Sequence, residues 1–413
     1  MRTISVQQRR RLMVRRHHLA GDAGDPEAVT RAVIALHATD PASVYLSVLA
    51  RSSVSTLADV ARALYERRSL VRWMAMRRTL FVFPREDIPL VQAAVSTLVA
   101  ATLRKRLIST LERNGAEPPV IGDTAGWLDA LASRVEHALR TRGEATGAEL
   151  STDEPLLRTA IAVRAPSDRP QNVTTSLLTW MSAEGRLVRG TPTGAWTSRQ
   201  HRWEPVSRWW PNGLPGVDPD QAREALARRW LTCFGPATVD DLQWWTGWNK
   251  TTVRRTLGNL QVDEIDLHGG PGIVLGAGRM STADAAPCDA PLARTGSAET
   301  PSASLLPALD PTPMGWKHRD WMFGIDQRAV FDQAGNIGPT VWWNGEVIGS
   351  WATTAAGELR TRILADRGAQ AVAAVDSAAA QLHKRLDGAT VTPAIRTSLE
   401  RSISHTTRPK PQQ

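Results

Sequence analysis

Apolar residues recur at helical spacing in the first third of the chain, and short polar stretches containing proline interrupt them. Asp25-Pro26 has the pattern of an N-cap followed by proline in the first helical turn, and Asp40-Pro41 repeats it. Thr56 offers a third cap, and the β-branched and aromatic run Thr79–Phe83 has the composition of a strand that Pro84 ends. We therefore expect helices at 5–19, 26–38, 42–51 and 57–67 and a strand at 79–83.

The same order of helices followed by paired strands returns twice along the chain. In the second repeat a helical pattern ends at Gly185, and the composition of Thr191–Gly194 predicts a turn between two strands. Helix, turn, helix and hairpin is the pattern of a winged helix-turn-helix. We expect a helix at 175–184 in the second repeat, and in the third helices at 218–234, 239–246 and 249–260 with a strand pair at 263–276.

The composition changes after the third repeat. Residues 281–303 are small, polar and rich in proline, which predicts a flexible loop. Asn344-Gly345 lies between two apolar runs and predicts a hairpin with a type I′ turn, within a small β region that forms a sheet or a barrel. Residues 358–386 predict one or two helices, and the last eight residues predict a disordered end.

The expected fold is mostly α with β: three tandem winged helix-turn-helix units plus a C-terminal β-barrel-like domain with helices. We place the units at 1–140, 141–215 and 216–283, the flexible loop at 284–303, the C-terminal domain at 304–400 and a disordered tail at 401–413.

The amino-acid composition and charge limit the kinds of partner that a protein with this fold could bind. The chain has 413 residues, 42% of them hydrophobic, yet its longest apolar stretches are too short for a membrane span. Its formal net charge is +9 and nearly all the basic residues are arginine, which favours a polyanion as partner. Cys233 and Cys288 form neither a disulfide framework nor a metal cluster. We expect a cytoplasmic, nucleoid-associated monomer that binds no membrane and no metal.

The sequence contains no P-loop, dinucleotide fingerprint, zinc spacing or nucleophile elbow, so we expect no cofactor. The stretch that could carry chemistry is His37-Ala38-Thr39, placed between two expected helices. Where the chain turns, His37 and Thr39 can point at one shared spot. The alternative is that Thr39 and Asp40 only cap the next helix and that His37 is a hydrogen-bonded core histidine.

Four stretches carry a family resemblance that runs in order from about Arg9 to Leu399. They are LHATDPASVYLSVLAR at 36–51, VRWMAMRRTLFVFP at 71–84, ARRWLTCFGPATVDDLQWWTG at 227–247, and LLPALDPTPMGWKHRDWMFG at 305–324 followed by GNIGPTVWWNGEVIGSWA. The chain resembles the winged-helix DNA glycosylases of the AlkZ/YcaQ type. That resemblance implies three tandem winged helices and a C-terminal β-barrel-like domain around duplex DNA.

The resemblance also implies a reaction. Members of this family hydrolyse the bond between deoxyribose and an N7-alkylated purine, bulky adducts and crosslinks included. Their Gln-x-Gln or Gln-x-Asp motif positions the attacking water, and in this chain the two chemical positions of the motif fall on His37 and Thr39. A protonated His37 would repel a cationic sugar, so the pKa of His37 must lie at or below the working pH. No lysine lies near the motif, so we expect no lyase step.

We expect double-stranded, alkylated DNA as the partner, with its phosphates bound by basic residues of the wings, the third repeat and the C-terminal region. The candidate contacts are Arg77, Arg78, Arg186, Arg189, Arg199, Arg202, Lys250, Arg254, Lys317 and Arg319. Two other functions stay open at this stage: a non-catalytic winged-helix regulator or lesion binder, and a protein–protein scaffold.

Overall fold

The computed structural model describes residues 2–162, 171–276 and 301–405. The first unit contains α2, which begins after its cap Asp25, and a sheet of order β2-β4-β3. Its elements are β1 Arg2–Thr3, α1 Val6–Arg16, α2 Pro26–Ala32, β2 Leu36–His37, α3 Pro41–Leu49, α4 Leu57–Ala61 continued by the π-helix η1 Arg62–Glu66, β3 Leu70–Ala75 and β4 Thr79–Pro84.

The helix predicted over 26–38 is wrong beyond Ala32, because the chain there leaves the helix and enters a strand. Ile34 adopts a left-handed backbone with φ of 66°, and Leu36 and His37 then pair with Val82 and Phe81 of β4. Pairing with β2 satisfies backbone groups on the edge of β4 that a longer helix would have left without partners. His37 therefore belongs to a strand.

The second and third units repeat the element order of the first. In each, a residue just after the first helix pairs with the last strand of the hairpin: Ala145 with Trp203, and Ala237 with Ile273. The second unit has α7 Thr124–Arg142, α8 Gly147–Asp153, α9 Val173–Ala183, β8 Leu187–Pro192 and β9 His201–Pro205. The third has α10 Pro219–Phe234, α11 Val239–Thr246, α12 Lys250–Asn259, β10 Val262–Asp266 and β11 Pro271–Leu275.

The helices and strand pairs predicted for the second and third repeats are present in the structure.

Shorter elements connect the three units. The connection between the first and second units runs through α5 Ile88–Val91, the π-helix η4 Gln92–Ser96 and α6 Thr97–Asn114. The small strands are β5 Ala116–Glu117, β6 Ala160–Ile161 and β7 Gln171–Asn172, and the 3₁₀ turns are Met76–Arg78 (η2), Arg85–Asp87, Pro155–Arg158, Val206–Arg208, Asp320–Met322 and Gln327–Ala329.

The C-terminal region forms an open sheet of order β12-β13-β14-β15. The expected barrel is not formed by the described residues, because β12 and β15 remain edge strands that do not pair with each other. The predicted type I′ turn is confirmed by positive φ angles at Asn344 and Gly345. The elements are β12 Ala303–Leu306, β13 Thr340–Trp343, β14 Glu346–Thr353, β15 Leu359–Ile363, α13 Ala369–Leu386 and α14 Ser398–His405.

Two boundaries in this region need correction. Residues 359–363 form β15 and not a helix, since each pairs with a residue of β14. Residues 401–405 of the predicted disordered tail belong instead to α14, which extends to His405 and buries Ile403, and the rest of that tail lies outside the described residues. The flexible loop expected at 284–303 lies mostly outside the described residues, and Ala303 already belongs to β12.

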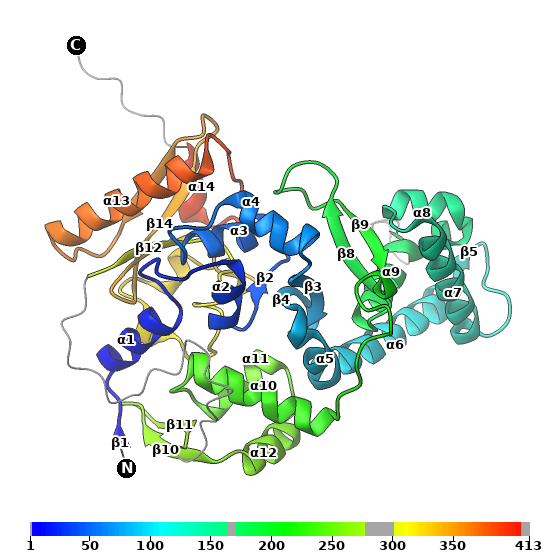
Figure 1. Ribbon diagram of the computed structural model, residues 1–413, viewed down its shortest axis with the longest axis horizontal. Helices are drawn as coiled ribbons and strands as arrows, with labels where there is room; N and C mark the ends of the chain where they lie inside the picture. Colours follow the sequence, from blue (N-terminus) through cyan, green and yellow to red (C-terminus); the bar gives the residue numbers. More distant parts are fainter. Residues whose placement is uncertain (1, 163–170, 277–300, 406–413) are drawn as a thin grey trace.

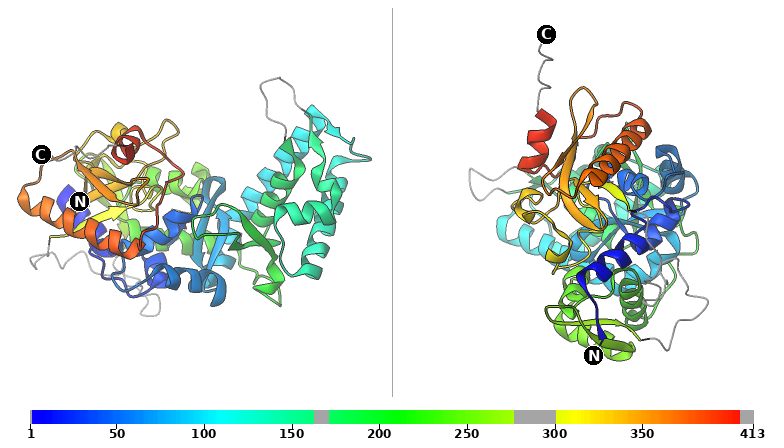
Figure 2. Two further views of the ribbon diagram at one scale, coloured as in Figure 1. Left: turned by 90° about the horizontal axis from the view of Figure 1, so that it is seen from above. Right: turned by 90° about the vertical axis from the view of Figure 1, so that its left-hand side faces the viewer.

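The first unit lies at the centre of the molecule (Figure 1), while the second unit extends away on one side (Figure 2). Helix α3 is buried along all nine residues. Its Val44 and Val48 belong to the main apolar core, and its Leu46 and Leu49 belong to the core of the C-terminal sheet. A helix that is apolar all round must be covered on every side, so α3 requires both neighbours.

A fully buried ion pair joins the end of α3 to the C-terminal region. The Arg51 guanidinium donates to both carboxylate oxygens of Asp310, at 2.6 and 2.8 Å, and both side chains have no solvent exposure. Ser47 also donates to Asp310 at 2.8 Å, and Arg51 donates to Thr312 Oγ1 at 2.6 Å. Four polar side chains therefore bond one another in the interior, and of their nitrogen and oxygen atoms Arg51 Nε is left without a partner among the described residues.

The network extends to α1 and α10 through His17. Thr312 Oγ1 accepts from Arg51, so its own proton is free to go to His17 Nδ1 at 2.9 Å. The second ring nitrogen then carries the proton and donates to the Cys233 carbonyl oxygen at 3.2 Å. Complete burial and the neighbouring Arg51 charge hold the pKa of His17 well below its usual range, which keeps this arrangement neutral.

We predict that Arg51→Met lowers the free energy of unfolding by about 3–5 kcal/mol, because it leaves the Asp310 carboxylate buried and unpaired. Urea denaturation measures the change. The double variant Arg51→Met with Asp310→Leu should recover much of the loss, since it contains no buried charge. Arg328→Gln, which breaks the exposed pair with Asp326, is the control and should change little. If Arg51→Met were as mild as that control, the network would not be an important source of stability.

Candidate active site

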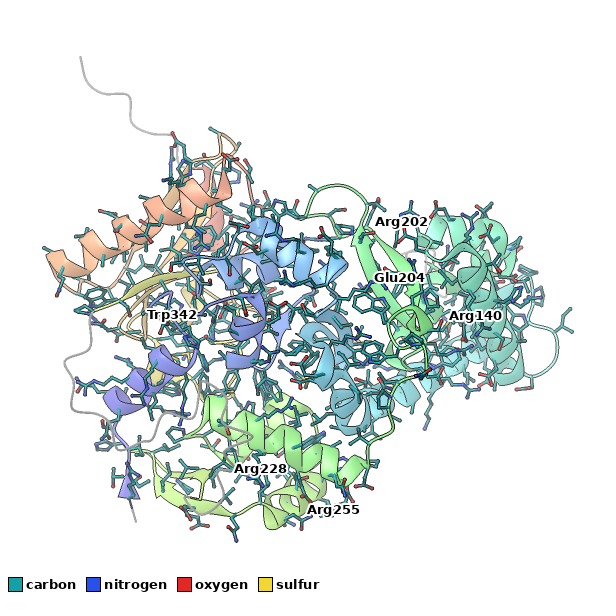
Figure 3. All side chains as sticks on the ribbon, in the orientation of Figure 1. Arg140, Arg202, Glu204, Arg228, Arg255 and Trp342 are labelled. Carbon is teal, nitrogen blue, oxygen red and sulfur yellow. The ribbon has the colours of Figure 1, made fainter. Side chains whose placement is uncertain are left out.

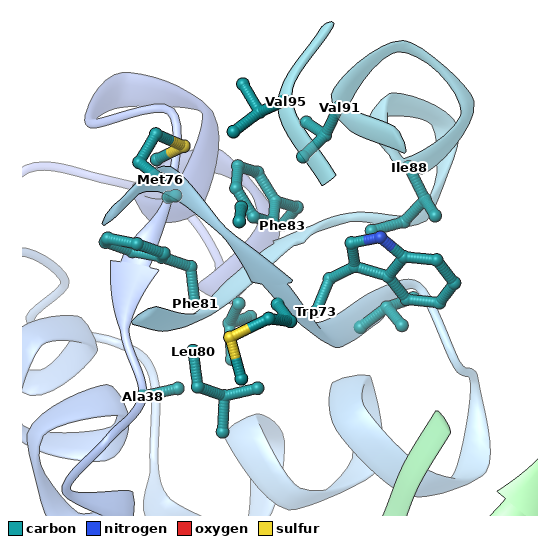
Figure 4. Close-up of a cluster of buried hydrophobic side chains, with 14 of the residues drawn as sticks. Ala38, Trp73, Met76, Leu80, Phe81, Phe83, Ile88, Val91 and Val95 are labelled. Atoms are coloured by element: carbon teal, nitrogen blue, oxygen red, sulfur yellow. The ribbon is translucent and has the colours of Figure 1, made fainter. Parts of the chain in front are cut away.

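The His37-Ala38-Thr39 stretch runs from the end of β2 to the start of α3. The Ala38 amide donates to the Leu80 carbonyl oxygen at 2.9 Å, so the pairing with β4 continues past His37. Ala38 is buried beside Leu80 in the apolar cluster shown in Figure 4. Side chains alternate along a strand, so anchoring Ala38 in the core directs His37 and Thr39 to the opposite side.

His37 is buried without a hydrogen-bond partner. Its ring meets Phe81 edge-on with 5.1 Å between centroids, and its residual exposure is 7%. Neither ring nitrogen makes a hydrogen bond to any described residue, and Nδ1 is fully buried. Burial, aided by the charge of Arg77, lowers the pKa of His37 to about 3. The imidazole is therefore neutral, and one nitrogen has a lone pair that the described residues do not use.

Thr39 and Asp40 have different roles from each other. Thr39 is exposed, and its hydroxyl makes no hydrogen bond to any described residue, so it does not cap α3. Asp40 is the cap: one carboxylate oxygen accepts from the Ala42 amide at 3.3 Å and the other from the Ala394 amide at 2.7 Å. Both oxygens of Asp40 are thus occupied, which leaves His37 and Thr39 as the polar groups available to a ligand.

A cationic group lies close to His37. Arg77 follows β3 with a left-handed backbone, φ of 54°, and its guanidinium lies 4.0 Å from the centroid of the Trp244 ring on α11. Arg319 approaches the same ring at 5.4 Å. Burial lowers the pKa of Arg77 to about 10, and the nearby Arg319 charge contributes. These two arginines form no salt bridge with a described carboxylate, so the first unit, the third unit and the C-terminal region jointly present positive charge here.

The other expected DNA contacts divide into two groups. Arg186 is held by Glu136 at 2.7 Å, Arg202 by Glu149 at 3.3 Å, and Lys317 by Asp240 at 3.2 Å. These three cations are already paired, because acidic residues of α7, α8 and α11 pack against them. The remaining ones form no salt bridge with described residues: Arg78, Arg199, Lys250 and Arg254 are exposed, while Arg189 lies over the Trp203 ring.

The hairpin β8–β9 is therefore less basic than its sequence indicates. Two of its arginines are neutralised by ion pairs. His201 on β9 is largely buried, and burial together with the Arg189 charge lowers its pKa to about 4. Figure 3 shows Arg202 and Glu204 on β9, between the first unit and the helices of the second.

Sequence reasoning missed two residues of interest, Arg72 and Trp244. Arg72 lies within the apolar strand β3, and the only signal was one charged residue in that run. Trp244 lies where α11 meets the first unit and the C-terminal region, and its ring contacts two cations there. Its neighbour Trp245 is buried, so the half-buried position of Trp244 follows from the amphipathic face of α11.

No three histidine, cysteine or acidic side chains gather as a metal site within the described residues. Among those same residues, the helices are too short or too polar to cross a bilayer.

Comparison with known proteins adds three findings. The profile of a family described as DNA glycosylase AlkZ-like matches residues 30–385. An interstrand DNA cross-link repair glycosylase of Streptomyces sahachiroi is 28% identical over 141 residues, which is 32% of this chain and only 35% of that protein. The solved structure of Streptomyces sahachiroi DNA glycosylase AlkZ matches with a TM-score of 0.68 and 22% identity, covering 95% of this chain and 99% of that one.

Proposed function

The chain belongs to the AlkZ-like DNA glycosylase family, and we propose that it hydrolyses the glycosidic bond of N7-alkylated purines, bulky ones included, in double-stranded DNA. The observation that carries the proposal is a neutral, hydrogen-bond-free His37 next to an exposed Thr39. The resemblance of the stretch at 36–51 implies that both lie at the polar positions of the family motif. A buried histidine with a purely structural role is expected to form hydrogen bonds through its ring nitrogens.

The chemistry needs little from the protein. N7 alkylation makes the purine cationic, so the C1′–N9 bond can break with its electron pair leaving on the base and without a general acid. The remaining task is to place a water molecule against C1′ and to accept its proton. Neutral His37 accepts that proton while Thr39 holds the water as donor and acceptor. Because His37 carries no charge, it does not repel the oxocarbenium-like transition state.

Neither Asp40 nor a lysine is available beside the motif to take part in a further catalytic step. Asp40 is occupied at both oxygens by backbone amides, so it serves the fold more than the transition state. The first lysine along the chain is Lys105, far from the motif in sequence, so the proposed enzyme is monofunctional.

We assign DNA binding to the three repeated units as winged helices in series. In the third unit α12 begins at Lys250 and carries Arg254, both exposed, which suits a helix that lies against phosphates. In the first unit the turn between β3 and β4 presents Arg78 to solvent and Arg77 toward Trp244. Arg319 joins them from the C-terminal region. A monomer is sufficient for this arrangement, since one chain supplies all three units.

We predict that His37→Ala slows single-turnover excision of N7-methylguanine from a duplex by about a hundredfold or more, the usual scale for loss of a positioned general base. Thr39→Ala should cost less, because other groups can still orient the water. His37→Gln should retain most activity, since the amide oxygen can accept the same proton contact. His137→Ala, an exposed histidine on α7, is the matched control and should excise normally.

Thermal melts of each variant separate chemistry from folding. If His37→Ala excises at the wild-type rate, His37 has no part in catalysis. If the wild-type protein excises neither N7-methylguanine nor a bulky N7 adduct but binds both duplexes, the chain is a non-catalytic lesion binder. The His-Ala-Thr departure from the family motif makes that the second candidate.

We predict that duplex affinity falls steeply with salt, and that Arg78→Ala and Arg254→Ala each lower the slope of log affinity against log salt by about 0.9. Both arginines are exposed and have no carboxylate partner among described residues, so they can pair with phosphate. Arg328→Ala, whose cation is already paired with Asp326, should leave the slope unchanged. Equal slopes for all three variants would remove Arg78 and Arg254 from the DNA interface.

A further inference from the structure

Cationic and hydroxyl side chains gather where the sheet of the first unit packs against the hairpin of the second. They come from four elements: Arg72 on β3, Tyr65 on η1, Arg189 on β8 and His201 on β9. The Arg72 guanidinium lies 5.5 Å from the centroid of the Tyr65 ring, and that of Arg189 lies 5.0 Å from that of Trp203. The His201 ring packs edge-on against the same tryptophan at 4.7 Å.

Several hydrogen-bond donors of this cluster lack partners among the described residues. Arg72 is only 4% exposed, yet its Nε and Nη2 are buried without a hydrogen bond. These two nitrogens form one edge of the guanidinium, the edge that binds an oxyanion through two parallel hydrogen bonds. Arg189 Nε and the Tyr65 hydroxyl are buried without a hydrogen bond at the same junction, where Tyr65 lies near Tyr45. His201 Nδ1 donates to the Arg199 carbonyl oxygen at 3.1 Å, so the neutral ring leaves Nε2 as an unpartnered acceptor.

The described residues supply no acid to compensate the cluster. Neither Arg72 nor Arg189 forms a salt bridge with them. Glu204, the acid on β9, belongs to the other face of the hairpin, where it packs against Gly190 and pairs with Arg68 at 3.0 Å. Burial and the Arg72 charge lower the pKa of Arg189 to about 10, so the two guanidiniums destabilise each other.

We propose that Arg72, Arg189 and Tyr65 form a binding site for one phosphate group, with His201 packed beside it. Water could accept hydrogen bonds from these donors, but it would leave two neighbouring positive charges uncompensated. A phosphate has several oxygens that each accept hydrogen bonds, so donors from three elements can bind one such group. Arg72 is buried, while Tyr65, Arg189 and His201 are only partly buried.

The phosphate that occupies this site could be a backbone phosphate of DNA or free inorganic phosphate. Either would bridge β3 of the first unit and β8 of the second. The site is separate from His37, so it does not depend on whether the protein excises a base.

The test is isothermal titration of the full-length protein with inorganic phosphate in chloride buffer of matched ionic strength. We expect saturable binding of one phosphate. Arg189→Gln and Tyr65→Phe should weaken it, the former by about tenfold or more, since it removes a charged contact. Arg106→Gln on α6 removes the same charge from an exposed position and should bind phosphate like the wild type. Arg72→Met should abolish binding if it folds, and the other two variants test the site if it does not.

A second titration in the presence of saturating undamaged duplex identifies the source. Loss of phosphate binding there assigns the site to a DNA backbone phosphate, whereas retained binding assigns it to free phosphate. The proposal is overturned if the wild-type protein shows no saturable binding, or if Arg189→Gln and Arg106→Gln bind phosphate equally. Neither result bears on excision, which is measured separately.

Discussion

The buried ion pair between Arg51 and Asp310 determines where the candidate active site lies. Two opposite charges without solvent exposure are stable only when they are well hydrogen-bonded, and Ser47 and the Thr312 amide complete the Asp310 carboxylate while Thr312 Oγ1 accepts from Arg51. Of the three Arg51 guanidinium nitrogens, Nε has no partner among the described residues. Because Arg51 follows directly after α3, this requirement fixes one end of the helix to the C-terminal region. Arg385 of α13 strengthens the attachment by donating to the Leu49 carbonyl oxygen at 2.6 Å.

The other end of α3 is fixed as well. Asp40 caps its first turn and also accepts from the Ala394 amide, so the C-terminal region holds both ends of a helix about 14 Å long. His37 and Thr39 immediately precede that cap. Their position therefore follows from the complete burial of α3, with no need for hydrogen bonds of their own. This leaves their polar atoms available for a water molecule or a substrate, which is what catalysis by positioned groups requires.

Much of the fold could be predicted from the sequence, because caps and turns are local signals. Asp25, Asp40 and Thr56 each cap the helix predicted for them, and Asn344-Gly345 forms the expected turn. The predictions were wrong where the secondary structure of a segment depends on pairing with residues far along the chain. Strand β2 exists only because β4 pairs with it, and β15 because β14 does. The same holds for the site: that His37 is neutral and that Arg186 and Arg202 are already paired depend on residues far along the chain.

The central claim is that His37 acts as a neutral base, and its pH dependence tests that claim most directly. The measurement is the single-turnover rate of N7-methylguanine excision by the wild-type protein from roughly pH 5.5 to 8, corrected for spontaneous base loss at each pH. With a pKa near 3, His37 stays unprotonated throughout, so the account predicts a level rate. A rate that falls about tenfold per pH unit below pH 6.5, the behaviour of an ordinary exposed histidine base, would contradict it.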